Sequence, residues 1–234
     1  MKRFLLVVVA LCAMAVGAFA QSFEGTMTMQ MTIPQLGGNP IPMTIYMKGD
    51  KSATSMQTPM GGEMHTYTDL QKMKTVMVMG GKMGYEVDLN KAKEAAASAE
   101  PKEVVHPSST GKSKTINGYA CDEFIMNIKD GQMDMWMTKD FPKDIMSSIS
   151  KSMGRNLGGM RSNQGAGAEG AFKELTDKGY APVQVNMTKD GQVMATVEFV
   201  KYEKKSVDDK DVTVPADVTI QPMPDMSGRP GMGH

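Results

Sequence analysis

The chain has 234 residues, and its 26 Lys plus Arg against 26 Asp plus Glu give a formal net charge of zero. This length suits one domain with a core of its own, and the balanced charge excludes the basic footprint of a nucleic-acid-binding domain. The composition is unusual in methionine, with 26 residues against 7 phenylalanines, 6 tyrosines and 1 tryptophan. Methionine must therefore supply much of the apolar packing.

Residues 1–20 have the pattern of a secretory signal peptide. Two basic residues precede an apolar stretch, and Ala18-Phe19-Ala20 is a small-residue cleavage site. We expect the mature chain to begin at Gln21 and to be periplasmic or extracellular, with association to the outer membrane left open. Cys12 follows a leucine, so we interpret it as part of the signal core and not as a lipidated start. No later segment is apolar enough to span a membrane.

A run of short, alternating segments predicts a β-meander over the first third of the mature chain. Residues 22–33 alternate strictly and place Met27, Met29 and Met31 on one face. Gly, Pro and Asp residues separate the segments that follow, as hairpin turns require. Strands are predicted over 22–33, 41–48, 52–58, 63–69, 73–79 and 82–88.

The segment 118–141 reads as a central β-hairpin that turns at Asp130-Gly131. A two-residue loop there makes one face wholly apolar, which favours this register. The expected facing pairs on that apolar face are Ile128 with Met133, Met126 with Met135, and Phe124 with Met137. On the other face they are Asn127 with Asp134, Ile125 with Trp136, and Glu123 with Thr138.

A second hairpin is predicted over 181–205, with a three-residue loop at 189–191 that places Val185 opposite Ala195. Helices are predicted over 90–100, 141–153 and 171–178, and a polar loop over 101–113. The expected fold is α+β and mainly antiparallel: a strongly curved sheet or incomplete β-barrel with two or three covering helices.

The predicted organisation is one β-rich domain over 21–220. A mobile Gly-rich loop is expected over 154–170, and a disordered Met/Pro/Gly tail over 221–234. The same Gly-rich stretch contains Gly165-x-Gly167-x-x-Gly170, but no apolar strand precedes it, so a dinucleotide site is not predicted.

No catalytic motif is present, and we expect a protein that is not an enzyme and needs no cofactor. Cys121 is the one cysteine after the signal, and no base stands near it in the sequence. Glu63 and His65 share a strand face, but two ligands without a third do not make a metal site.

The methionine stripes permit three interpretations: core packing, an adaptable surface for an apolar ligand, or thioether binding of copper(I). We favour the second, a non-catalytic binding protein for a hydrophobic or acylated ligand such as a lipid or lipoprotein. The predicted ligand-binding residues are Met27, Met29, Met31, Met43, Met47, Phe124, Met126, Met133, Met135 and Met137. For copper, the alternative, the ligands would be Met27, Met29 and Met31, or Met223, Met226, Met232 and His234 in the tail.

Several short motifs resemble those of an exported bacterial family, the domain-of-unknown-function family 4412. In chain order these motifs are Phe23-x-Gly25, Lys48-Gly-Asp-Lys51, Gly118-Tyr-Ala-Cys121 and Met135-Trp-Met-Thr-Lys-Asp140. That family is distantly similar to the periplasmic lipoprotein carriers of the LolA/LolB type. The resemblance implies an incomplete barrel with helices over an apolar cavity, and it carries over no catalytic or ligand residues.

Overall fold

The structure is a computed structural model, and it describes residues 24–58, 61–91, 94, 105–128, 131–141 and 166–222. The predicted signal peptide, most of the predicted helices 90–100 and 141–153, and the tail after Pro222 lie outside the described residues. No helix in the described part of the chain is long and apolar enough to cross a lipid bilayer.

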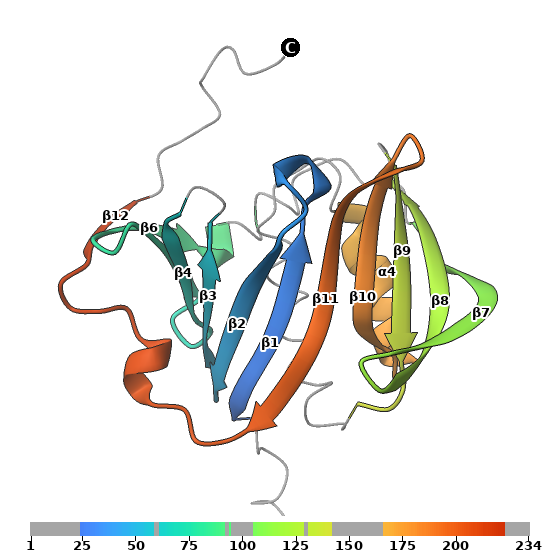
Figure 1. Cartoon of the computed structure of the whole chain (residues 1–234). Helices are drawn as coiled ribbons and strands as arrows, with labels where there is room; N and C mark the ends of the chain where they lie inside the picture. The colour runs from blue at the N-terminus through green and yellow to red at the C-terminus, as the bar shows by residue number, and fades with distance from the viewer. Residues whose placement is uncertain are drawn as a thin grey trace, which may run out of the picture.

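The described residues form one open sheet of twelve strands in the order β12-β6-β5-β4-β3-β2-β1-β11-β10-β9-β8-β7 (Figure 1). All neighbours pair antiparallel except β12 and β6, which are parallel. The strands are β1 (Gly25–Thr32), β2 (Pro40–Lys48), β3 (Lys51–Gln57), β4 (Glu63–Asp69), β5 (Lys74–Met79), β6 (Met83–Asp88), β7 (Ser108–Ile116), β8 (Tyr119–Ile128), β9 (Gly131–Thr138), β10 (Ala181–Lys189), β11 (Gln192–Lys204) and β12 (Thr219–Pro222).

The first six strands form the predicted meander, and each lies within a few residues of its expected range. Their pairings run without a bulge from β1 to β6. Since side chains alternate along each strand, unbroken pairing keeps every cross-strand row on one face.

One face of this meander is covered by the segment after β11. Val207 and Val212 pack on Ala53 in one small core, and Val218 packs on Val76 and Val78 in another. The short 3-10 helix η2 (Asp209–Val212) belongs to this segment. Lys48 anchors it, because its Nζ donates to the Val207 carbonyl at 2.9 Å and lies 3.0 Å from the Asp209 carboxylate.

The larger cores belong to the other half of the sheet. The single described helix of more than two turns, α4 (Ala166–Asp177), lies against β9 and β10 in Figure 1 and buries Phe172 and Leu175 against the apolar side of β8, β9 and β10. A second core joins β1 and β2 to β8–β11 and contains the ring contacts of Phe141 with Phe199 (4.6 Å between centroids) and with Tyr119 (4.7 Å).

The prediction of an α+β fold with two or three covering helices was wrong. In the described part of the chain only α4 has seven or more residues, so the class is mainly β, a single open sheet. The polar loop predicted over 101–113 was also wrong in part, because β7 begins at Ser108 and is an edge strand rich in Ser, Thr and Lys. Helix α4 starts at Ala166, inside the stretch 154–170 that was predicted to be a loop.

The register of the β8–β9 hairpin differs from the prediction by two residues. Phe124 pairs with Met135 instead of Met137, and Ile128 pairs with Gly131. A shift of two residues keeps each side chain on its expected face. Gly131 is a strand residue here and not a turn residue. Its lack of a side chain fits this position, because a Cβ there would collide with the carbonyl oxygen of Thr188 on β10.

The β10–β11 hairpin also departs from the predicted register. Val185 pairs with Val197 and not with Ala195, because the loop has two residues and the strand pairing contains a bulge between Met187 and Thr188. Asp190 (φ 51°) and Gly191 (φ 76°) both have positive φ, the conformation that a two-residue hairpin loop requires.

Replacing Gly131 by alanine should destabilise the protein, because its Cβ would collide with the β10 backbone. We expect a loss of about 1–3 kcal/mol in the free energy of unfolding, measured from urea denaturation. Gly170→Ala is the matched control: that glycine lies in α4, where an added Cβ would have no atom within 4 Å, and the change should stabilise by about 0.5–1 kcal/mol. Equal stability of the wild type and Gly131→Ala would contradict the close approach.

Candidate functional site

The ten predicted ligand-binding residues do not line one surface. Met27, Met29 and Met47 lie in the core that joins β1 and β2 to β8–β11, with Met43 packed against it. The other group lies in the core under α4, and it comprises Phe124, Met126, Met133, Met135 and Met137. Met126, Met135 and Met137 are 0% exposed, so in this structure they serve as core residues. Met31 is partly buried and belongs to neither core.

The pairing of the meander creates a different methionine feature. On each strand from β1 to β6 one methionine stands directly opposite a methionine of the next strand. This methionine row comprises, in order across the sheet, Met29, Met43, Met56, Met64, Met79 and Met83. Directly opposed residues have Cβ atoms about 4.5–5.5 Å apart, so neighbouring thioethers in the row are within contact distance.

The row lies on a face that carries no charge. Along strands β1 to β6, the positions that share the row's face are Gly25, Met27, Met29, Met31, Ile41, Met43, Ile45, Met47, Ser52, Thr54, Met56, Met64, Thr66, Thr68, Thr75, Met77, Met79, Met83, Tyr85 and Val87. We call this the charge-free face. The acidic, basic and histidine residues of the same strands all lie on the opposite face: Lys48, Lys51, Glu63, His65, Asp69, Lys74, Glu86 and Asp88.

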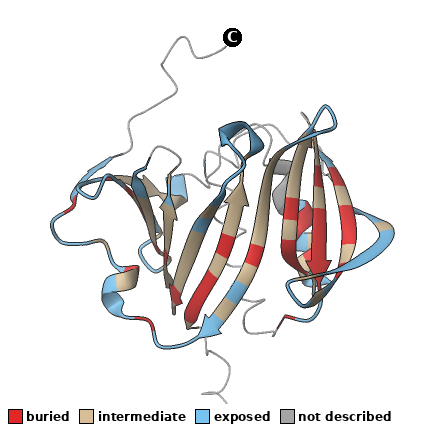
Figure 2. Ribbon diagram, in the orientation of Figure 1, coloured by how far each residue is buried: buried red, intermediate tan, exposed pale blue. Residues whose placement is uncertain are grey.

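Exposure is low at the β1 end of the methionine row and high at the β5–β6 end. Met29 is 8% exposed within the core, whereas Met79 is 50% and Met83 45% exposed. Figure 2 shows the same trend, with buried residues most frequent on β1, β8, β9 and β10, and mostly intermediate residues on β3 and β4. No core cluster of the described residues contains Met56, Met64, Met79 or Met83.

Hydroxyl groups are the polar component of the charge-free face. Thr54 and Thr66 are cross-strand partners, as are Thr68 and Thr75, whose hydroxyl oxygens are 3.1 Å apart and hydrogen-bonded. The face can therefore contact apolar groups through the methionines and accept or donate a few hydrogen bonds through the threonines.

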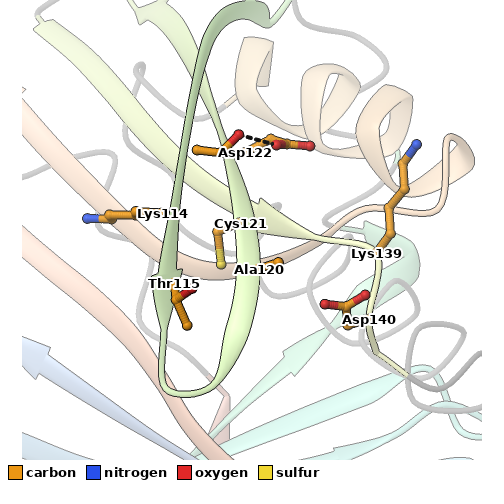
Figure 3. A pocket seen from close by; sticks show the side chains of 8 residues that line it. Lys114, Thr115, Ala120, Cys121, Asp122, Lys139 and Asp140 are labelled. Carbon is orange, nitrogen blue, oxygen red and sulfur yellow. Dashed lines mark hydrogen bonds between the residues drawn. The ribbon is translucent and has the colours of Figure 1, made fainter.

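Two surface hollows lie in the other half of the sheet, and neither contains a predicted ligand-binding residue. The first, of about 470 Å³, is formed where β7, β8 and the end of β9 meet, and Figure 3 shows Cys121 between Lys114 on one side and Lys139 with Asp140 on the other. The second, of about 420 Å³, has polar walls formed by residues from the β8–β9 and β10–β11 hairpins.

The cationic and thiol groups of the first hollow already have partners. Lys114 Nζ donates to Gln184 at 3.0 Å and lies 4.0 Å from the centre of the Trp136 ring, and Lys139 Nζ lies 4.5 Å from the centre of the Tyr180 ring. Cys121 is 1% exposed. Burial raises the pKa of the Cys121 thiol above its ordinary value, which disfavours the reactive thiolate.

Glu63 and His65, the two possible metal ligands of the sequence analysis, do not lie on the face of the methionine row. His65 Nε2 is 3.4 Å from the Glu63 carboxylate on the opposite face of β4. Within the described ranges, no group of three or more His, Cys, Asp or Glu residues is placed to hold a metal ion.

The sequence comparison places the chain in a family. A family profile described as "Domain of unknown function (DUF4412)" matches residues 23–218. The chain belongs to this family. The resemblance inferred from the short motifs is thus confirmed. No curated protein matches the sequence.

Among solved structures, an uncharacterized conserved protein from Thermus thermophilus is similar with a TM-score of 0.50 and 8% identity, over 87% of this chain and 92% of that chain. This likeness concerns the fold alone. PNGF-II has a TM-score of 0.42 and 12% identity, over 86% of this chain and 31% of that one. A LolA superfamily protein from Nitrosomonas europaea is a weak neighbour, with a TM-score of 0.28 and 8% identity over 83% and 91% of the two chains.

Sequence reasoning missed four members of the row, Met56, Met64, Met79 and Met83. The signal was present in the sequence, because these residues flank the Gly-containing segments that separate the predicted strands 52–58 and 63–69, and 73–79 and 82–88. Counting outward from each turn, as in any antiparallel hairpin, would have placed Met56 opposite Met64 and Met79 opposite Met83.

The Cys121 thiol should resist alkylation in the folded protein. In protein produced from Gln21 onward, Cys121 is the one cysteine, so iodoacetamide labelling followed by mass spectrometry reports on it alone. We expect labelling at pH 8 to be at least about 100-fold slower in buffer than in denaturant, because it requires local opening and a thiolate. Rapid labelling of the folded protein would show instead that the first hollow holds an accessible, reactive thiol.

Proposed function

We propose that this protein is an exported, non-catalytic binding protein for a hydrophobic or acylated molecule, which it holds on the charge-free face of β1–β6. The observation that carries the proposal is the separation of charge between the two faces of the meander. Charged residues stand at regular positions on one face and at none on the other.

Partial exposure supports a binding role for this face. A face that served only as core would be buried along its whole length, but Met79 and Met83 remain about half exposed. Exposed apolar surface that is continuous with a core is a common feature of binding sites for apolar partners.

The dimensions of the row suit an acyl chain. Six strands spaced about 4.8 Å apart make the row about 24 Å long. Since the hydrocarbon core of a bilayer, about 30 Å thick, holds two acyl chains end to end, one chain is about 15 Å long. An extended chain can therefore lie across several strands and contact thioethers along its length.

Methionine is well suited to such a ligand. Its unbranched side chain has three rotatable bonds and a polarizable sulfur, so a row of methionines can adapt to chains that differ in length or unsaturation. The neighbouring threonine hydroxyls supply polar contacts for a carboxylate or ester group.

Binding of a dansyl-labelled fatty acid by the full mature chain tests the proposal. We expect saturable fluorescence enhancement, and at least about 10-fold weaker binding by Met56→Asp, because the variant places an unpaired charge beneath the apolar chain. Met56 is only partly buried, so the variant should fold, and circular dichroism checks this.

Gln57→Asp is the matched control, because it adds the same charge at the next position of β3, on the opposite and charged face. We expect its affinity for the labelled fatty acid to stay within about twofold of wild type. Absence of saturable binding by the wild type, or an equal loss in both variants, would contradict a ligand site on the charge-free face.

A further inference from the structure

We propose that the exposed part of the methionine row, Met56, Met64 and Met79, forms a thioether site for a soft monovalent metal ion, copper(I). The proposal depends on the pairing of the strands and does not rest on the binding of an acyl ligand. It differs from a site built from Met27, Met29 and Met31, which follow one another along a single strand.

The spacing of the sulfur atoms distinguishes the two arrangements. Residues on one face of a single strand are about 6.8 Å apart, twice the rise per residue. Directly opposed residues on neighbouring strands are closer, with Cβ atoms about 4.5–5.5 Å apart. Met64 is opposed to Met56 on one side and to Met79 on the other. The outer two flexible side chains can lean toward the central one and bring three sulfur atoms around one ion.

The chemistry of the row selects the ion. Thioethers are uncharged, soft ligands that favour copper(I) over hard cations such as calcium or magnesium, which need oxygen ligands. Carboxylates and histidine of the same strands lie on the opposite face, with His65 and Glu63 as the nearest in sequence to Met64. Hard cations therefore find no charged ligand on the charge-free face of β1–β6.

Access to the three sulfur atoms is provided at the tips of the strands. Met79 is 50% exposed and precedes the Gly80-Gly81 turn, where a Cβ at either glycine would have no atom within 4 Å. An ion can therefore reach the row from solvent without opening either large core. Met43 and Met83 flank the three ligands in the same row and extend the run of thioethers on each side.

Anaerobic titration of the full mature chain with copper(I), in competition with bicinchoninate, tests the site. We expect the triple variant Met56→Leu/Met64→Leu/Met79→Leu to bind at least about 10-fold more weakly than wild type. Met77→Leu should leave the affinity unchanged, because Met77 lies on the same face but is opposed to Thr66 and Tyr85, not to methionine.

A second measurement locates the ion even where a triple variant is poorly folded. In protein labelled with ¹³C-methyl methionine, silver(I), a redox-inert substitute, should shift the methyl resonances of Met56, Met64 and Met79 and leave that of Met77 in place. Shifts confined to other methionines, or copper(I) affinity retained by a folded triple variant, would overturn the proposed site.

The same leucine substitutions keep the copper proposal separate from the acyl proposal. Leucine preserves the apolar character of the face, so the triple variant should still bind the dansyl-labelled fatty acid. If the triple variant loses copper(I) binding but still binds the fatty acid, the result supports a metal site on the row. If the folded triple variant keeps its copper(I) affinity, the metal assignment is overturned, and the acyl proposal is then judged by the Met56→Asp variant alone.

Discussion

The charge-free face depends on the unbroken antiparallel pairing of β1 to β6. Side chains alternate with a period of two, so a one-residue slip in any of the five pairings would mix the methionines with the charged residues of the opposite face. The same register determines where the segment after β11 packs. Val207 and Val218 contact strand residues whose side chains lie on the face opposite the methionine row. The polarity of each face of the meander therefore depends on this register.

The other half of the sheet follows a different plan. Irregular pairing occurs between Pro182 and Gln184, between Met187 and Thr188, and between Ser109 and Ser113. Bulges bend strands and increase their twist, and here they accompany the two large cores and helix α4. Strands β1–β6 thus carry mostly partly exposed side chains, whereas strands β7–β11 and α4 contain most of the buried ones.

Sequence patterns were sufficient for the regular half and insufficient for the bulged half. Strict alternation and Gly-rich turns identify the six meander strands, because both are local signals. In the β8–β9 hairpin, Gly131 lies in the strand and meets the Thr188 carbonyl, a contact between residues 57 positions apart. A count within the hairpin cannot reveal such a contact. Strand β7 was missed because an exposed, polar edge strand shows no alternation of apolar and polar residues.

The methionine row was missed because its members lie on different strands, whereas a periodic pattern in the sequence reveals only residues that share one strand.

Methionine is an unusual choice for a β-sheet surface such as the methionine row. Valine and isoleucine fit a pleated sheet better, and ordering a methionine side chain costs up to about 1.5–2 kcal/mol of conformational entropy, against about 0.5–1 for leucine or isoleucine. The buried cores also use methionine, at Met126, Met135 and Met137, so this entropy cost is met throughout the protein and not on the row alone. Half-exposed methionines such as Met79 and Met83 keep much of that freedom in the folded protein. Adaptable shape and soft sulfur are two properties that leucine lacks, and the two proposed binding roles of the row rest on them.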